Sequence, residues 1–123
     1  MTQPEEPVPG SLRVHVGGRV LRLPPESILW VEAENQYARV HTVTSEEHVV
    51  SRPLAAVHQA LGGERFIRIH RSAVVNVDFV GGVVGGHSVL LANGVVLRLS
   101  RRRRAEVVRR LGSRPRGADL PRE

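Results

Sequence analysis

Short runs of alternating apolar and polar residues, separated by glycine, asparagine and proline, dominate this chain of 123 residues. Valine, a β-branched residue that favours strands, is the commonest type, with 21 copies. Leu12–Val16 and Arg19–Leu23 flank Gly17-Gly18, and Asn93-Gly94 is a strong hairpin signal further along. The pattern predicts a mostly β fold with about nine strands and two helices. Other strands are expected at 28–32, 37–44, 48–51, 77–84, 88–91 and 95–99, and the stretch 66–76 contributes two more short apolar pieces.

One predicted helix follows Pro53, a residue that suits the first helical position. Gly62-Gly63 is expected to end this helix after about two and a half turns. Its residues at helical spacing are Leu54, Val57, His58 and Leu61. We expect this helix to cover the core and to carry no chemistry.

The second predicted helix begins with four consecutive arginines, Arg101–Arg104, after Ser100 as the expected N-cap. Its expected apolar stripe is narrow and consists of Ala105, Val108 and Leu111. Cations at a helix start oppose the helix dipole, at a cost of roughly 0.3–1 kcal/mol each, and they also repel one another. A docked anion would convert this cost into attraction. We therefore favour phosphate binding over a merely solvated basic face, and membrane binding is less favoured because the stripe lacks Trp and Phe.

The stretch Phe66–Asn76 places a polar segment, His70-Arg71-Ser72, between two short apolar pieces. The apolar flanks should hold this segment in a fixed position. His70 and Ser72 suit phosphate, and the guanidinium of Arg71 can grip either phosphate or a guanine edge. The alternative from residue types alone is an ordinary surface loop.

Composition narrows the classes of function. The formal net charge is +6, and all 18 basic residues are arginine. Half of them fall between Arg98 and Arg116, which points to a polyanionic partner, above all nucleic acid. An arginine-rich proteome would explain the lack of lysine but not this clustering. The chain has no cysteine, no membrane-length apolar run and no signal-peptide pattern, so we expect a cytoplasmic protein with no membrane partner.

The chain is long enough for one domain, expected at residues 11–112. The acidic, proline-rich residues 1–10 are expected to form a disordered leader, and residues 113–123 a flexible basic tail.

Catalysis is not expected. Glu32 and Glu34 share a strand face and could resemble a carboxylate pair, but we favour ordinary polar positions, or ion pairs with a nearby arginine, for one or both of them. No G-x-S-x-G motif accompanies His70, Ser72 and Asp78. The six histidines are scattered without a helical i,i+4 pair, so the sequence supports no metal site, and no cofactor is predicted.

Four segments, in order, resemble the LytTR-type DNA-binding domain, the output domain of LytR/AlgR-family bacterial response regulators. Residues 28–37 (ILWVEAENQY) resemble its early block, and residues 66–76 (FIRIHRSAVVN) are very close to its most specific motif. Residues 90–94 (LLANG) and 99–103 (LSRRR) are similar to its closing hairpin and final motif. The resemblance covers about residues 12–111.

The resemblance implies elongated, antiparallel β-sheets with two or three short helices, and a transcriptional regulator whose loops, rather than a recognition helix, read major grooves of double-stranded DNA. Arg71 and Arg102 fall where the family reads base edges, and His70 and Arg101 where it contacts phosphate. Arg39 and Arg68 could bind phosphate or form intramolecular ion pairs. The full predicted DNA-binding set is Gln36, Tyr37, Arg39, Arg68, His70, Arg71, Ser72, Arg101, Arg102, Arg103 and Arg104.

The family also implies paired direct repeats in the DNA, bound by two copies of the domain. Its response regulators carry a receiver domain upstream, whereas ten residues precede the domain here, which would rule out phosphorylation control within this polypeptide if the sequence is complete. The chain would then be an autonomous regulator, or else a domain cut from a longer protein. One alternative function is a small basic β-rich RNA-binding module, which is disfavoured because exposed aromatic residues are scarce and Phe66 and Phe79 are expected to be buried. The other is an interaction-only protein, which would not need the arginine cluster.

Overall fold

The computed structural model describes residues 11–112, and the predicted leader and tail lie outside these residues. The described part is mostly β and contains ten strands, two α-helices and three short 3-10 helices. The strands are β1 (Leu12–Val16), β2 (Arg19–Leu23), β3 (Ile28–Glu34), β4 (Tyr37–Thr42), β5 (Glu47–Val50), β6 (Phe66–His70), β7 (Ala73–Asn76), β8 (Val80–Val84), β9 (Ser88–Leu91) and β10 (Val96–Arg98). The helices are η1 (Pro25–Ser27), α1 (Leu54–Leu61), η2 (Val77–Phe79), η3 (Arg101–Arg103) and α2 (Arg104–Gly112).

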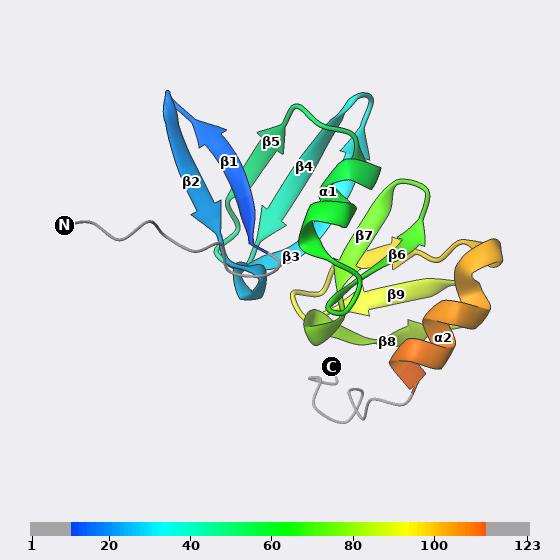
Figure 1. Cartoon of the computed structure of the whole chain (residues 1–123). Helices are drawn as coiled ribbons and strands as arrows, with labels where there is room; N and C mark the ends of the chain where they lie inside the picture. Colours follow the sequence, from blue (N-terminus) through cyan, green and yellow to red (C-terminus); the bar gives the residue numbers. More distant parts are fainter. Residues whose placement is uncertain (1–10, 113–123) are drawn as a thin grey trace.

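The strands form three antiparallel sheets (Figure 1). The central sheet has five strands in the order β5-β4-β3-β7-β6. The β1–β2 hairpin forms a separate two-stranded ribbon beside β5, and β8, β9 and β10 form a three-stranded sheet on the other side (Figure 1). The predicted hairpins around Gly17-Gly18 and Asn93-Gly94 are therefore confirmed.

The central sheet separates two hydrophobic cores. Successive residues of a strand point to opposite faces, so a strand covered on both sides is apolar at nearly every position. Phe66 and Val74 belong to the first core, whereas Ile67, Ile69 and Val75 belong to the second. The β6–β7 hairpin is therefore held from both faces.

A helix covers each core. Leu54, Val57 and Leu61 of α1 are buried in the first core, as the helical spacing predicted. His58 donates a hydrogen bond from Nε2 to the carbonyl oxygen of Phe66 beside it (3.1 Å). Helix α2 packs against β8 and β6 and contributes Val107 and Leu111 to the second core.

Three local predictions were wrong. The expected strand at 77–84 begins only at Val80, because residues 77–79 form a 3-10 helix whose first turn is capped by the Asn76 side chain. The apolar stripe of the last helix is Val107 with Leu111 instead of Ala105, Val108 and Leu111. Ser100 does cap the segment, but residues 101–103 wind as a 3-10 helix, which shifts the phase of the α-helix that follows. Phe79, expected to be buried, is half-buried.

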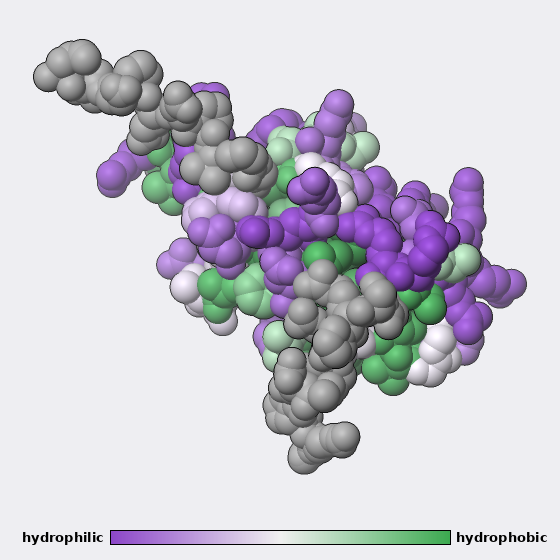
Figure 2. All heavy atoms as spheres, turned by 60° about the horizontal axis from the view of Figure 1, so that its bottom comes forward, coloured by the Kyte–Doolittle hydropathy of each residue, from purple (hydrophilic) through white to green (hydrophobic). Residues whose placement is uncertain are grey.

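Exposed apolar side chains are dispersed over the sheets. Val20, Val49 and Val96, which are 50%, 47% and 57% exposed, lie in three different sheets. Figure 2 brings the lower side of Figure 1 forward and shows hydrophilic residues over much of that face, with hydrophobic residues in several separate places. Single exposed apolar residues are normal for a folded protein. Within residues 11–112, no helix is both long and apolar enough to cross a membrane.

Asn76 is a fully buried polar residue whose side chain connects distant segments by hydrogen bonds. Its Nδ2 donates to the carbonyl oxygens of Pro25 (3.1 Å) and Ile28 (2.9 Å), and its Oδ1 accepts from the N–H of Asp78 (2.9 Å). The two donated hydrogen bonds join the end of β7 to η1 and to the start of β3, and the accepted bond caps η2.

The replacement Asn76→Ala is expected to reduce the free energy of unfolding by about 2–4 kcal/mol, because it removes the three hydrogen bonds of a fully buried side chain. Urea denaturation followed by circular dichroism measures this loss. Asn93→Ala is the matched control, since Asn93 is exposed and makes one side-chain hydrogen bond, to the N–H of Val95. It should cost less than about 1 kcal/mol. Equal losses for the two variants would contradict the structural role assigned to Asn76.

Candidate nucleic-acid interface

Most of the side chains predicted to bind DNA lie at one end of the strands of the central sheet, where β3 and β6 finish and β4 and β7 begin. This end of the sheet is called the interface edge. Strand β3 is antiparallel to both β4 and β7, with Glu34 opposite Tyr37 and Glu32 opposite Ala73. This register places the β3–β4 turn and the β6–β7 turn at the same edge. Figure 1 shows both turns on the same side of the molecule as the start of the final helical segment.

The β6–β7 turn consists of two residues, Arg71 and Ser72. Neither has a positive φ, so the turn is not one of the types that favour two-residue hairpins. A register shift between Arg68 and His70 adjoins the turn. The Arg68 guanidinium spans the turn, with Nε donating to the carbonyl oxygen of His70 (3.1 Å) and Nη2 to that of Arg71 (2.6 Å). Arg68 therefore shapes the turn from within the protein.

Three further hydrogen bonds hold the turn. The Ser72 N–H donates to Nδ1 of His70 (3.1 Å), and the Ser72 carbonyl oxygen accepts from the N–H of Ala33 in β3 (2.9 Å). The Ser100 N–H donates to the carbonyl oxygen of Ile69 (2.8 Å). The turn is thus joined both to the central sheet and to the arginine segment, in agreement with the prediction of a fixed position.

The arginine segment starts at Ser100, whose Oγ accepts from the N–H of Arg103 (3.4 Å). A groove of about 450 Å³ lies between this segment and the β6–β7 turn. Its lining contains no carboxylate and consists of His70, Arg71, Arg98, Ser100, Arg101, Arg102 and Arg103.

Two arginines differ from the sequence-based picture. Arg104, predicted to act with its three neighbours, does not line the groove, and its guanidinium lies against the β8–β9 turn, with Nη2 2.8 Å from the position that a Cβ on Gly86 would occupy. Arg98, absent from the predicted set, does line the groove. Its signal was present in the sequence, because the alternation of β10 puts Arg98 on the face opposite the partly buried Leu97 and buried Leu99.

Electrostatic repulsion is concentrated around His70. Partial burial lowers the pKa of His70, and the positive charges of Arg98, Arg71, Arg103 and Arg68 lower it further. Partial burial and the charge of Arg103 likewise lower the pKa of Arg68. The Nδ1 atom of His70 accepts a hydrogen bond from Ser72, which agrees with an imidazole that is neutral at pH 7. The groove is therefore suited to an anion that would offset these positive charges.

The β3–β4 turn carries the other predicted contacts. Asn35 has a φ of 61°, a left-handed conformation that asparagine tolerates well. Gln36 is exposed, and the Tyr37 side chain beside it is 48% exposed. These two side chains are available to a partner that approaches the edge.

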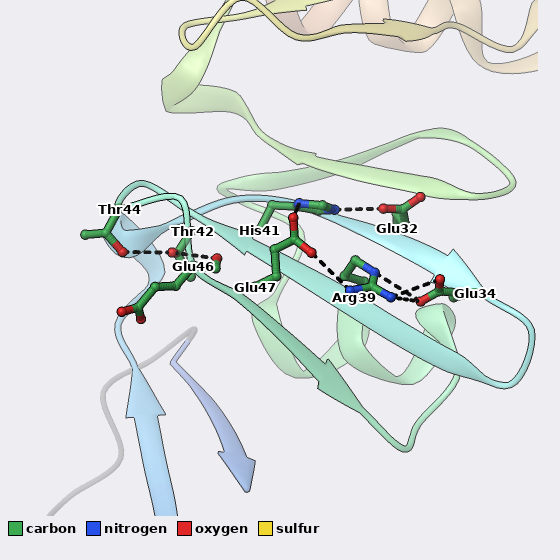
Figure 3. Close-up of polar contacts among 8 residues, drawn as sticks. All are labelled: Glu32, Glu34, Arg39, His41, Thr42, Thr44, Glu46 and Glu47. Atoms are coloured by element: carbon green, nitrogen blue, oxygen red, sulfur yellow. Dashed lines mark hydrogen bonds and ion pairs between the residues drawn. The ribbon is translucent and has the colours of Figure 1, made fainter. Parts of the chain in front are cut away.

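Arg39 is engaged within the protein. Its Nε and Nη2 donate to the carboxylate of Glu34 (3.1 and 3.0 Å), and its Nη1 donates to Glu47 (3.0 Å) (Figure 3). The two hydrogen bonds from Arg39 to Glu34, followed by the one to Glu47, raise the pKa of Arg39. The intramolecular ion pair that the sequence left open is confirmed, while a contact between Arg39 and DNA stays a prediction.

The neighbouring carboxylate, Glu32, pairs with His41 rather than with Glu34. Its Oε1 lies 2.7 Å from Nε2 of His41 (Figure 3). The His41 ring stacks on Trp30 with centroids 4.4 Å apart and planes 4° apart. Glu34 therefore pairs with an arginine, as one of the alternatives expected, whereas Glu32 pairs with a histidine. Among residues 11–112, no cluster of three or more His, Asp or Glu side chains could hold a metal ion.

Comparisons with known proteins agree with this geometry. The family model described as LytTr DNA-binding domain matches residues 18–112. The Transcriptional regulatory protein LytR of Staphylococcus aureus, from strains N315 and USA300 among others, is 28% identical over 95 residues. That match covers 74% of this chain but only 38% of LytR, so the chain spans well under half of that relative's length.

A solved structure has the same fold. The LytTr DNA-binding domain of a response regulator from Bacillus cereus aligns with a TM-score of 0.66 and 22% sequence identity. The alignment covers 83% of this chain and 95% of the other. The elongated antiparallel β architecture predicted from the sequence is thereby confirmed.

The pKa of the His70 imidazole, measured by NMR titration, is expected to lie below the ordinary histidine value of 6.5. Because the unfolded chain then binds the proton more readily, His70 should reduce stability progressively as the pH falls below about 6.5. Arg98→Gln should raise the midpoint, since it removes the largest of the neighbouring charge effects. Arg109→Gln, which removes an equal charge from the exposed face of α2, should leave it unchanged. A midpoint insensitive to Arg98 would show that this charge does not reach His70.

Proposed function

Because this chain belongs to the LytTR DNA-binding domain family, we propose that it binds double-stranded DNA sequence-specifically and regulates transcription. The observation that carries the proposal is the fixed β6–β7 turn beside a groove rich in arginine and without a lining carboxylate. A rigid turn suits base reading, since the cost of ordering the contact residues is met during folding rather than on binding.

The proposed reading element is the tip of the β6–β7 hairpin. A two-stranded ribbon can enter the major groove, which is roughly 12 Å wide. The Arg71 side chain is exposed at this tip and makes no hydrogen bond or ion pair with residues 11–112. Arg71 would grip guanine O6 and N7, the commonest specific contact between protein and DNA. Arg102 would read a second base edge from the arginine segment, which lies across the protein groove from Arg71.

The neighbouring side chains would position the domain on the phosphate backbone. His70, Ser72, Arg101 and Arg103 lie at or beside the groove and offer hydrogen-bond donors suited to phosphate. Arg98 joins them as an additional contact suggested by the structure. Arg104 would act from the neighbouring β8–β9 turn rather than from the groove.

The β3–β4 turn would make the separate contact predicted for it, through Gln36 and Tyr37. Arg39 is better placed to orient this turn than to bind DNA, because its guanidinium already bonds two carboxylates. Arg68 is similarly assigned to positioning, through the carbonyls of His70 and Arg71. These assignments divide the predicted set into contact residues and residues that hold them.

The wider setting of the proposal is a cytoplasmic regulator that places two copies of this domain on paired direct repeats. RNA is the competing partner for a basic β-rich domain. RNA-binding modules commonly stack bases on exposed aromatic rings. Here Phe66 is buried and Trp30 is stacked on His41, which leaves Tyr37 as the aromatic ring exposed at the interface edge. This arrangement favours DNA.

A selection experiment tests the proposal. The purified protein is mixed with a pool of random DNA duplexes at roughly physiological salt, with single-stranded RNA as competitor, and the retained DNA is sequenced. Enrichment of a repeated motif that resists RNA supports the proposal and supplies the operator. Absence of enrichment, or loss of binding to RNA, would contradict it.

Arg71→Ala is expected to relax base preference at one position of the selected motif and to weaken binding to that motif by about 1–3 kcal/mol. Titration of a panel of duplexes substituted at each position measures both effects. Arg101→Ala is the comparison variant, expected to weaken binding to all duplexes by a similar factor. If Arg71→Ala also weakens every duplex equally, Arg71 contacts phosphate rather than a base.

A further inference from the structure

The interface edge continues beyond the three segments described so far. Strand β5 is antiparallel to β4, with Val50 opposite Ala38, so β5 ends beside the start of β4. Ser51 and Arg52, which follow β5, therefore lie at the same edge as Tyr37 and the β3–β4 turn. Neither Ser51 nor Arg52 was in the predicted DNA-binding set.

A second groove, of about 540 Å³, opens here between the β1–β2 ribbon and the end of β5. Its polar lining is Arg13, His15, Ser51 and Arg52, with no carboxylate. The Nη2 of Arg52 donates to the carbonyl oxygen of Arg13 (3.0 Å), which ties the two walls of the groove together. Neither arginine forms an ion pair with a carboxylate of residues 11–112.

The two grooves lie at opposite ends of the edge. The sheet order β5-β4-β3-β7-β6 places four inter-strand steps between β5 and β6, or roughly 19 Å at about 4.8 Å per step. The arginine segment adjoins β6 through the bond from Ser100 to Ile69. This separation exceeds the roughly 12 Å width of a major groove. A duplex read by the central turns would therefore offer phosphates to both ends of the edge.

We infer that the groove between the β1–β2 ribbon and β5 is a second phosphate-binding site, in which Arg13 and Arg52 extend the DNA footprint past the β3–β4 turn. The inference rests on the proposed function, because the turns bring the duplex to this edge. Two guanidinium groups and a hydroxyl supply the donors that phosphate oxygens accept. The β1–β2 ribbon then contributes directly to binding besides covering the first core.

The dependence of binding on salt tests the inference. Each phosphate contact adds about 0.9 to the slope of log K against log salt concentration. Arg13→Gln should flatten this slope by about 0.9 unit on the selected duplex and leave base preference unchanged. It retains the Arg13 carbonyl that Arg52 binds, so the groove wall is preserved. Arg109→Gln is the charge-matched control and should leave the slope at the wild-type value.

The outcomes separate the two proposals. A wild-type slope for Arg13→Gln, together with a flatter slope for Arg101→Ala, would overturn the second site and leave the proposed function standing. Failure of the wild-type protein to select any DNA sequence would overturn the proposed function and the second site with it.

Site-directed cleavage gives an independent measurement. The chain has no cysteine, so His15→Cys creates a single attachment point for an iron chelate at the groove. The labelled protein should cleave the DNA backbone on the flank of the motif away from the bases read by Arg71. The same label at Arg109→Cys, on α2, should not cleave there. Absence of flanking cleavage from the His15 position would overturn the inference even if the salt slope changed.

Discussion

The structure depends on one hairpin being buried from two sides. Phe66 and Val74 of the β6–β7 hairpin enter the core beneath α1, and Ile67, Ile69 and Val75 enter the core beneath α2. Interiors are packed at near-crystalline density, so a hairpin held on both faces has little freedom to tilt or slide. The Arg71-Ser72 turn projects from this base. The Ala33 N–H donates to the Ser72 carbonyl oxygen, and the Ser100 N–H donates to that of Ile69, so both ends of the turn are held. Packing far from the turn thus determines where the exposed guanidinium of Arg71 lies.

The same architecture holds mutually repelling charges together. Arg71, Arg98 and Arg101–Arg103 line the groove together with His70. Partial burial lowers the pKa of His70, and the charges of Arg98, Arg71, Arg103 and Arg68 lower it further. Nothing in the groove lining offsets this repulsion, in contrast with Arg39, whose charge is balanced by Glu34 and Glu47 (Figure 3). This repulsion reduces the stability of the fold by about a few kcal/mol, and burial of the two hydrophobic cores offsets the loss. Binding of a polyanion would relieve this repulsion, so the unfavourable charge interactions of the free protein would favour binding.

Sequence reasoning succeeded where neighbouring residues decide the outcome. Gly-Gly and Asn-Gly gave the hairpins, the spacing of Leu54, Val57 and Leu61 gave a buried helix face, and Ser100 gave an N-cap. It failed where a distant segment intervenes. Residues 77–79 left the strand because the Asn76 amide caps a short helix while also bonding β3 and η1. The last helix turned Val107 inward because a preceding 3-10 turn shifted its phase. Arg104 lies against the β8–β9 turn rather than in the groove, through a contact that no local pattern records.

By itself, the sequence determined the alternation of the strands, the positions of the turns, the family motif and the clustering of arginine, since each follows from residue type and short-range spacing. Only the tertiary structure decided which of these features share one edge. The strand order β5-β4-β3-β7-β6 brings residues 36–37, 51–52 and 70–72 together, although they are separated along the chain. It also decided which arginines are paired and which face solvent. Side-chain partners across strands depend on register and packing, because hydrogen bonds and ion pairs act over a few ångströms in space rather than along the sequence.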